Sequence, residues 1–188
     1  MIKIQKKKRI VIAILLLIFT VLLCARLYRD NFTFETTTYG FIVDSSNEEY
    51  SILRNKTIVQ ISDLHNIKFK NNNLELIEAV NTINPNYILF TGDMVSAEDI
   101  DFSGFYSLVD AFSKKYTCFY VVGNHELGLS KSDLRSIYEY LNEKGVYVLD
   151  NNFVKTDGIN FYGLNYKDKY YVREDYTLDE MINDLRSS

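Results

Sequence analysis

The chain has 188 residues, of which 47% are hydrophobic and 14% aromatic, and its formal net charge is −4. This length and composition suffice for one domain with its own core and argue against general disorder. The first 29 residues contain seven Lys or Arg and no acid, so the remainder has 14 basic against 25 acidic groups, a net charge of −11. Because non-specific nucleic-acid binding requires a basic surface, we expect no nucleic-acid partner.

An almost uninterrupted apolar run extends from Ile10 to Ala25, and five cations precede it. A helix of this length covers about 24 Å, and flanking apolar residues extend it toward the roughly 30 Å of a bilayer core. Basic residues next to such a run favour the cytoplasmic side. We therefore expect a basic cytoplasmic tail at 1–9 and an uncleaved transmembrane anchor at 10–28, with the domain outside the cytoplasm at the cell membrane.

Two other interpretations of this segment stay open. A cleaved signal peptide fits the lengths of the basic and apolar parts, although Leu23 and Ala25 make a poor small-x-small cleavage site. A buried core helix is the third interpretation, but a helix that is apolar all round and follows five cations is unusual in a soluble core. Cys24 in this run and Cys118 in a later apolar stretch are expected to be unpaired.

The rest of the chain divides into residues 29–54, predicted to be a linker with a strand at Thr36–Val43, and residues 55–188, predicted to be the main domain. In that domain apolar runs alternate with helical patterns. Three strands are expected, at Thr57–Ile61, Tyr87–Thr91 and Cys118–Val122. With helices between them, they predict an α/β fold with a βαβαβ core and a parallel sheet.

The helical patterns present apolar faces to this sheet. The first helix is expected to bury Leu74, Ile77 and Val80 and to begin at a capping box of Asn72 and Glu75. The apolar positions of the next two helices are Phe105, Leu108, Val109 and Phe112, then Leu134, Ile137, Tyr138 and Leu141. Apolar residues three and four apart lie on one face of a helix, so these sets are expected to be buried.

After the third helix the pattern changes to short strands. They are expected at Val146–Leu149, Phe153–Lys155 and Ile159–Leu164, with Asp157-Gly158 as a hairpin turn. A last amphipathic helix is expected to start at Thr177.

Polar motifs follow the three main strands. They are Asp63-Leu64-His65, Gly92-Asp93 and Gly123-Asn124-His125-Glu126, and they contain both histidines of the chain. The carboxyl ends of parallel strands meet at one edge of a sheet, and residues two apart can leave an extended segment on one face. Carboxylate, imidazole and amide groups without a thiolate suit a hard divalent ion. The motifs therefore predict a metal site at this edge.

Taken in order, the three motifs resemble those of the calcineurin-like metallophosphoesterase family. The phrases Ile61–His65 and Gly163–Asn165 look most like its bacterial, membrane-associated branch, and the resemblance covers residues 55 to 165. The resemblance implies a four-layer α/β-sandwich and a hydrolase that cleaves phosphomonoesters or phosphodiesters with a metal-activated water. The substrate would be a small-molecule or lipid-linked phosphoester; the oligomeric state is left open.

The resemblance also implies a role for individual residues. Asp63 and His65 would hold one metal ion, and Asp93 would bridge two. Asn124 would bind the second ion, and His125 would contact the phosphate or protonate the leaving oxygen. Two divalent ions are implied, with manganese, iron, zinc and magnesium as candidates, and Glu126 is left as a structural residue.

The sequence departs from the family's pattern beyond these motifs. That pattern continues with another histidine and a Gly-His-x-His motif, whereas no histidine follows His125 here. We therefore expect a domain that lacks its C-terminal part, with impaired catalysis. The alternative is a non-catalytic membrane-anchored remnant with a binding or structural role.

Overall fold

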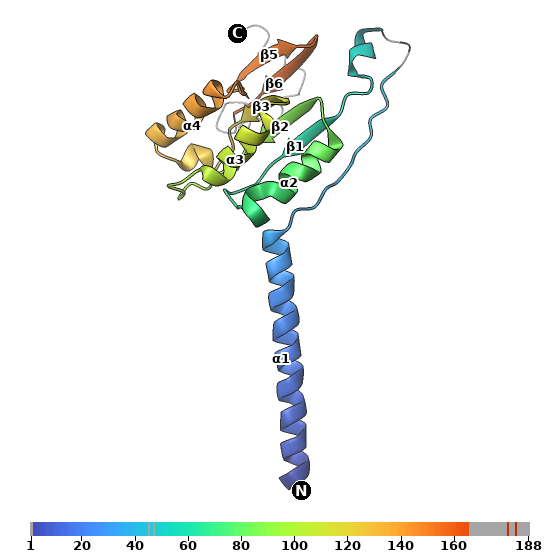
Figure 1. Ribbon diagram of the computed structural model, residues 1–188, viewed down its shortest axis with the longest axis vertical. Helices are drawn as coiled ribbons and strands as arrows, with labels where there is room; N and C mark the ends of the chain where they lie inside the picture. Colours follow the sequence, from blue (N-terminus) through green and yellow to red (C-terminus); the bar gives the residue numbers. More distant parts are fainter. Residues whose placement is uncertain (1, 45, 47, 166–179, 181–182, 184–188) are drawn as a thin grey trace. The chain divides into compact units, whose positions relative to one another are not determined.

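The computed structural model describes residues 2–44, 46, 48–165, 180 and 183. The chain forms two compact units, Met1–Tyr39 and Gly40–Ser188 (Figure 1). The predicted helix from Thr177 lies outside the described residues, apart from two positions that are helical.

The first unit is built on one helix, α1 (Ile2–Phe32) (Figure 1). Its segment Lys7–Arg29 has a mean hydropathy of 2.9 and is long and apolar enough to cross a membrane. None of that segment is buried, so the interpretation as a soluble core helix gains no support. An anchor and a signal sequence both satisfy these criteria, and the choice between them stays a prediction.

The strand predicted at Thr36–Val43 is absent. Residues 33–44 adopt no regular secondary structure, and Phe41 and Ile42 are 90% and 101% exposed. β-Branched and aromatic residues gave this segment strand propensity, but a strand also needs a neighbour to bond its N–H and C=O groups, and no described strand pairs with it. A short 3₁₀ helix, η1 (Glu48–Leu53), follows instead.

The core of the second unit is a parallel sheet with strand order β1-β2-β3-β4. Its strands are β1 (Ile58–Ile61), β2 (Tyr87–Thr91), β3 (Thr117–Val121) and β4 (Tyr147–Val148). Ile61 pairs with Phe90, and Thr91 pairs with Val121, so the carboxyl ends of the first three strands lie at nearly one level. The predicted parallel βαβαβ core is confirmed.

Three helices, α2 (Lys70–Ile83), α3 (Ser103–Phe112) and α4 (Lys131–Glu143), lie on one face of this sheet (Figure 1). Strands added in one direction by right-handed crossovers place every connecting helix on the same side. The ring of Phe105 on α3 packs at 5.4 Å from that of Phe90 and at 5.7 Å from that of Tyr120. All the apolar positions predicted for α3 are buried.

The predicted start of α2 is wrong. Asn71–Asn73 have left-handed backbone angles, with φ of 53°, 55° and 69°, so Asn72 and Glu75 form no capping box. The burial is also shifted: Leu76 is buried, whereas Leu74 is 45% exposed. Asparagine is one of the few residues that adopts this conformation readily, which a helical periodicity pattern does not reveal.

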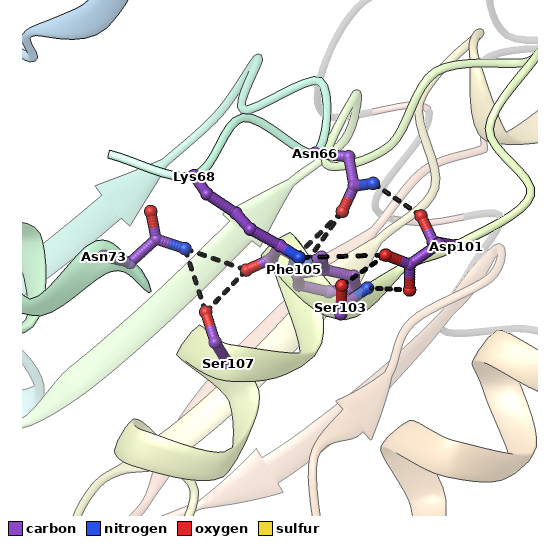
Figure 2. Close-up of polar contacts among 8 residues, drawn as sticks. Asn66, Lys68, Asn73, Asp101, Ser103, Phe105 and Ser107 are labelled. Carbon is purple, nitrogen blue, oxygen red and sulfur yellow. Dashed lines mark hydrogen bonds and ion pairs between the residues drawn. The ribbon is translucent and has the colours of Figure 1, made fainter. Parts of the chain in front are cut away.

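The fully buried side chain of Asn73 explains this irregular turn. Its oxygen accepts the backbone N–H of Phe69. Its nitrogen donates to the Gly104 carbonyl and the Ser107 hydroxyl, each at 2.9 Å (Figure 2). The left-handed turn thus lets one buried amide join α2 to α3.

A hairpin of β5 (Asn152–Thr156) and β6 (Ile159–Gly163) covers the other face of the sheet. Phe161 stacks on Phe119 with ring centroids 4.1 Å apart, and the Tyr87 hydroxyl donates to Asp157 at 2.8 Å. Burial raises the pKa of Tyr87 to about 12, and Asp157 adds to that shift.

The predicted hairpin turn is confirmed, because Asp157 and Gly158 have φ of 51° and 78°, the two positive angles that a tight hairpin turn requires. Helices, parallel sheet and hairpin make an α/β sandwich in the described residues. Cys24 and Cys118 are both unpaired, as expected.

Candidate metal centre

Three loops meet at the carboxyl ends of β1, β2 and β3. The middle loop, Gly92–Met94, uses its carbonyl oxygens to hold the loop that follows β1. These bonds run from Asp63 N–H to Gly92 O at 3.2 Å, from His65 N–H to Asp93 O at 3.0 Å, and from Asn66 N–H to Met94 O at 2.8 Å. The first two motifs are therefore joined along their backbones.

The backbone of the first loop is left-handed at the residues that make the first two of these bonds. Asp63 and His65 have φ of 54° and 47°, on either side of the buried Leu64. The prediction that Asp63 and His65 leave an extended segment on one face is therefore wrong. The Asp63 carboxylate instead accepts the Ser62 hydroxyl, while His65 lies against Ser96 and the ring of His125.

A network on the helix side anchors the same loop. The Asn66 oxygen accepts the N–H groups of Gly104 and Phe105 at the start of α3, at 2.9 and 3.3 Å, and its nitrogen donates to the Asp101 carbonyl (Figure 2). Lys68 pairs with the Asp101 carboxylate at 3.7 Å in the same view. This network fixes the loop that carries His65 to a helix packed on the sheet.

The third loop is joined to the middle one through Glu126, the first residue of the short 3₁₀ helix η2 (Glu126–Gly128). Its carboxylate is fully buried and accepts the backbone N–H groups of Asp93 at 2.9 Å, Met94 at 2.7 Å and Gly123 at 3.0 Å. Burial raises the pKa of the Glu126 carboxyl, and the amide hydrogen bonds oppose this rise. In addition, His125 N–H donates to Asp93 Oδ1 at 3.0 Å.

The motif glycines allow these loops to touch. Gly92 has φ of 88°, and a Cβ there would lie 2.7 Å from the Cα of Gly123. A Cβ on Gly123 would in turn collide with the backbone and carboxylate of Asp93. Both positions therefore require the absence of a side chain.

Three of the predicted site residues form a compact donor group. One ligand atom each of His65, Asp93 and His125 lies within 4.8 Å of the others, and the two rings meet edge to face with centroids 4.6 Å apart. Ser96 Oγ lies 3.3 Å from His65 Nδ1, which leaves Nε2 for a ligand. Nδ1 of His125 is buried without a hydrogen-bond partner in the described structure.

Two imidazoles and a carboxylate, with one buried nitrogen unsatisfied, fit a divalent metal ion. The group is half-buried, so an ion there would be only partly hydrated by bulk water.

The other two predicted ligands lie on an adjoining cleft. Asp63 and Asn124 are exposed and line a cavity of about 420 Å³ together with Asp93. Asp63 is not a member of the compact donor group. The remaining lining residues are Ser62, Thr91, Val121, Val122, Gly123, Tyr162, Gly163 and Leu164. Asp93 is the residue common to the donor group and the cleft.

Sequence reasoning missed several of these residues. It left Glu126 as a structural residue. The position of this carboxyl group directly after Asn124 and His125, near a strand end, was a signal that it contacts the site. Ser96 carried no local signal, because it reaches the site from a segment outside the motifs.

Helices on one face of a parallel sheet, a hairpin on the other and metal-ligand side chains at the strand ends define a metallophosphoesterase-type α/β protein. A family model described as calcineurin-like phosphoesterase matches residues 56–186. This match covers more than half of the chain, and the chain belongs to the calcineurin-like phosphoesterase family.

One curated relative is a protein of Campylobacter jejuni named as an uncharacterized metallophosphoesterase. It is 32% identical over 71 residues, which cover 37% of this chain and 19% of the relative. The alignment thus spans about a fifth of that relative's length.

Proposed function

We propose that the chain is a metal-dependent phosphoesterase that hydrolyses phosphomonoesters or phosphodiesters in the cleft at the strand ends. The observation that supports this proposal most strongly is the donor group of His65, Asp93 and His125, placed where Asp93 also lines a 420 Å³ cleft. Membership of a phosphoesterase family gives the reaction class.

We assign Asp63 and His65 to a first divalent ion, Asp93 to a bridging position and Asn124 to a second ion. Such ions, when bound, supply Lewis acidity to the phosphoryl oxygens and lower the pKa of water. The backbone N–H of His125 donates a hydrogen bond to Asp93 Oδ1, and this bond also fixes the direction of the Asp93 carboxylate.

The protein's own groups complete the site. We assign His125 to hydrogen bonding with the phosphate or to proton donation to the leaving oxygen. Tyr162 and Leu164 line the hairpin side of the cleft, where they would contact the leaving group and limit its exposure to water. The small-molecule or lipid-linked nature of the substrate belongs to this proposal as well.

We also propose that the α1 segment at 10–28 anchors the domain 55–188 in the cell membrane, with the tail 1–9 in the cytoplasm and 29–54 as linker. Its length and apolar character support anchoring, and the basic residues before it support this orientation. Cysteine labelling of intact cells at an introduced surface cysteine tests the orientation: labelling by a membrane-impermeant reagent supports it, and labelling only after lysis contradicts it.

A non-catalytic binding role is the second candidate. The observation that favours it is the exclusion of Asp63 from the compact donor group, which contains three residues among those described. A group of three donor residues can hold one metal ion more readily than it can hold two metal ions.

The experiment uses the full chain in detergent micelles with Mn²⁺ and an aryl phosphodiester. We expect turnover that Asp93→Asn lowers by at least about 100-fold, while Asp133→Asn on α4 leaves it unchanged. Absence of turnover at saturating Mn²⁺, in a chain that binds Mn²⁺, would support the binding role. Turnover that is unaffected by Asp93→Asn would refute the metal assignment.

His125→Gln tests whether this histidine acts on the phosphate or leaving oxygen, as assigned, or instead serves as a ligand of the metal ion. A drop in kcat with unchanged Mn²⁺ affinity identifies proton donation or phosphate contact. A matching loss of Mn²⁺ affinity identifies a metal ligand.

A further inference from the structure

Glu126 is the fully buried acid of the described structure, and no step of the proposed hydrolysis uses it. No Lys or Arg of the described residues forms an ion pair with it, and it accepts hydrogen bonds from three backbone amides. An ionised carboxylate is costly to bury unless such hydrogen bonds stabilise it. An apolar side chain would fill the same volume without that cost, so packing alone does not account for the acid.

The positions of the three amides indicate a more specific purpose. Two belong to Asp93 and Met94 in the loop after β2, and one belongs to Gly123 in the loop after β3. One rigid carboxylate therefore spans the two loops that carry Asp93 and His125. Because Asp93 Oδ1 also accepts the His125 N–H, the distance between these loops and the rotamer of Asp93 are set together.

We propose that Glu126 is a positioning residue that holds Asp93 in place as a ligand for a divalent cation, at a fixed distance from His125. This inference rests on the proposed function, because it assumes that the donor group binds a metal ion.

Asn73 provides a matched control. Like Glu126 it is fully buried and makes three hydrogen bonds, but two of these join α2 to α3 (Figure 2) and none reaches the loops that carry Asp93 and His125. Glu126→Gln and Asn73→Asp each exchange a single side-chain atom between oxygen and nitrogen. Both variants lose buried hydrogen bonds, so both are expected to unfold at lower temperature than the wild type.

The test measures Mn²⁺ affinity of the full chain in detergent by calorimetry, the Mn²⁺ EPR spectrum, and the melting temperature without metal. We expect Glu126→Gln to weaken Mn²⁺ binding by about 10- to 100-fold and to alter the spectrum. Asn73→Asp should keep Mn²⁺ affinity within about threefold of the wild type. Glu126→Asp keeps the charge but is shorter by one methylene, and its affinity should lie between those of Glu126→Gln and the wild type.

Wild-type affinity in Glu126→Gln would overturn the inference, as would an equal loss of affinity in Asn73→Asp. If Glu126→Gln does not fold, the Glu126→Asp variant decides, and wild-type affinity there overturns the inference. A wild-type chain that binds no Mn²⁺ would refute the proposed function and the inference together, whereas wild-type binding with unchanged variants refutes the inference alone.

Discussion

The two halves of the candidate metal centre are held in different ways. Asp93 and His125 are half-buried and lie on loops that are joined by backbone bonds, by glycine contacts and by the Glu126 carboxylate. Asp63 and Asn124 are exposed on the wall of the cleft. The comparison teaches that hydrogen bonds position the loops of both halves, since Asp63 N–H also donates to Gly92 O, whereas the two halves differ in how far their side chains are exposed to the cleft.

The largest effect is expected from Gly123→Ala, which breaks the interlocked half. A Cβ at this position collides with the backbone nitrogen and carboxylate of Asp93 and comes within 2.8 Å of the Glu126 carboxylate. We expect a loss of about 1–3 kcal/mol in the free energy of unfolding together with loss of Mn²⁺ binding. Urea denaturation and calorimetry measure the two effects. A variant that keeps wild-type stability and binding would contradict the tight contact between these loops.

Asn124→Ala, one residue further along the chain, probes the open half. Its side chain is exposed, so the free energy of unfolding should change by no more than about 0.5 kcal/mol. Turnover at limiting Mn²⁺ should nevertheless fall by about 10-fold, because the amide oxygen is assigned as a ligand. A loss in the free energy of unfolding as large as that of Gly123→Ala would contradict the proposed difference between the interlocked half and the exposed half.

Ser96→Ala sharpens the comparison from outside both halves. Loss of the 3.3 Å contact to His65 Nδ1 should loosen the ring and weaken Mn²⁺ binding by roughly 3- to 10-fold, the worth of one hydrogen bond. Ser136→Ala, which removes a hydroxyl that donates to a carbonyl within α4, is the control and should bind Mn²⁺ like the wild type. Equal affinities in both variants would exclude Ser96 from orienting His65.

The smallest effect is expected from Lys144→Met, which touches neither half. Lys144 pairs with Asp110 at 2.6 Å between α4 and α3, and this pairing holds the pKa of Asp110 below its usual value. Because that pKa is lowered on folding, the stabilisation is complete above about pH 4 and disappears as the pH falls through the folded-state pKa. The variant should therefore melt less than about 3 °C below the wild type at pH 7, and the gap should close near pH 2. A difference in melting temperature that grows as the pH falls would show that the pKa of Asp110 is not lowered by the pairing.

Much of the fold follows from local pattern. Continuous apolar runs at 57–61, 87–91 and 118–122 predicted β1, β2 and β3 to within one or two residues, and α3 buries every apolar position expected of it. The Asp157-Gly158 turn was equally readable, because few residue pairs adopt two positive φ angles. Patterns succeed where the preference of a segment and its place in the core agree.

Patterns failed where a distant partner decided the outcome. Residues 36–43 have strand propensity but no neighbouring strand to bond with, and Asn71–Asn73 leave the helical conformation so that one amide can reach α3. Asp63 and His65 were expected in an extended segment, but both have a left-handed backbone, and their N–H groups bond to carbonyls of the next loop.

The sequence by itself determined which chemical groups stand at the strand ends, because strand pattern and motif are both local properties. Only the tertiary structure decided how those groups are divided: His65, Asp93 and His125 into one donor group, and Asp63 and Asn124 onto the cleft. It also decided the part taken by Glu126, whose three amide partners belong to two loops about 30 residues apart in the chain. Hydrogen bonds between distant loops depend on how the strands are placed side by side, and no short stretch of sequence contains that information.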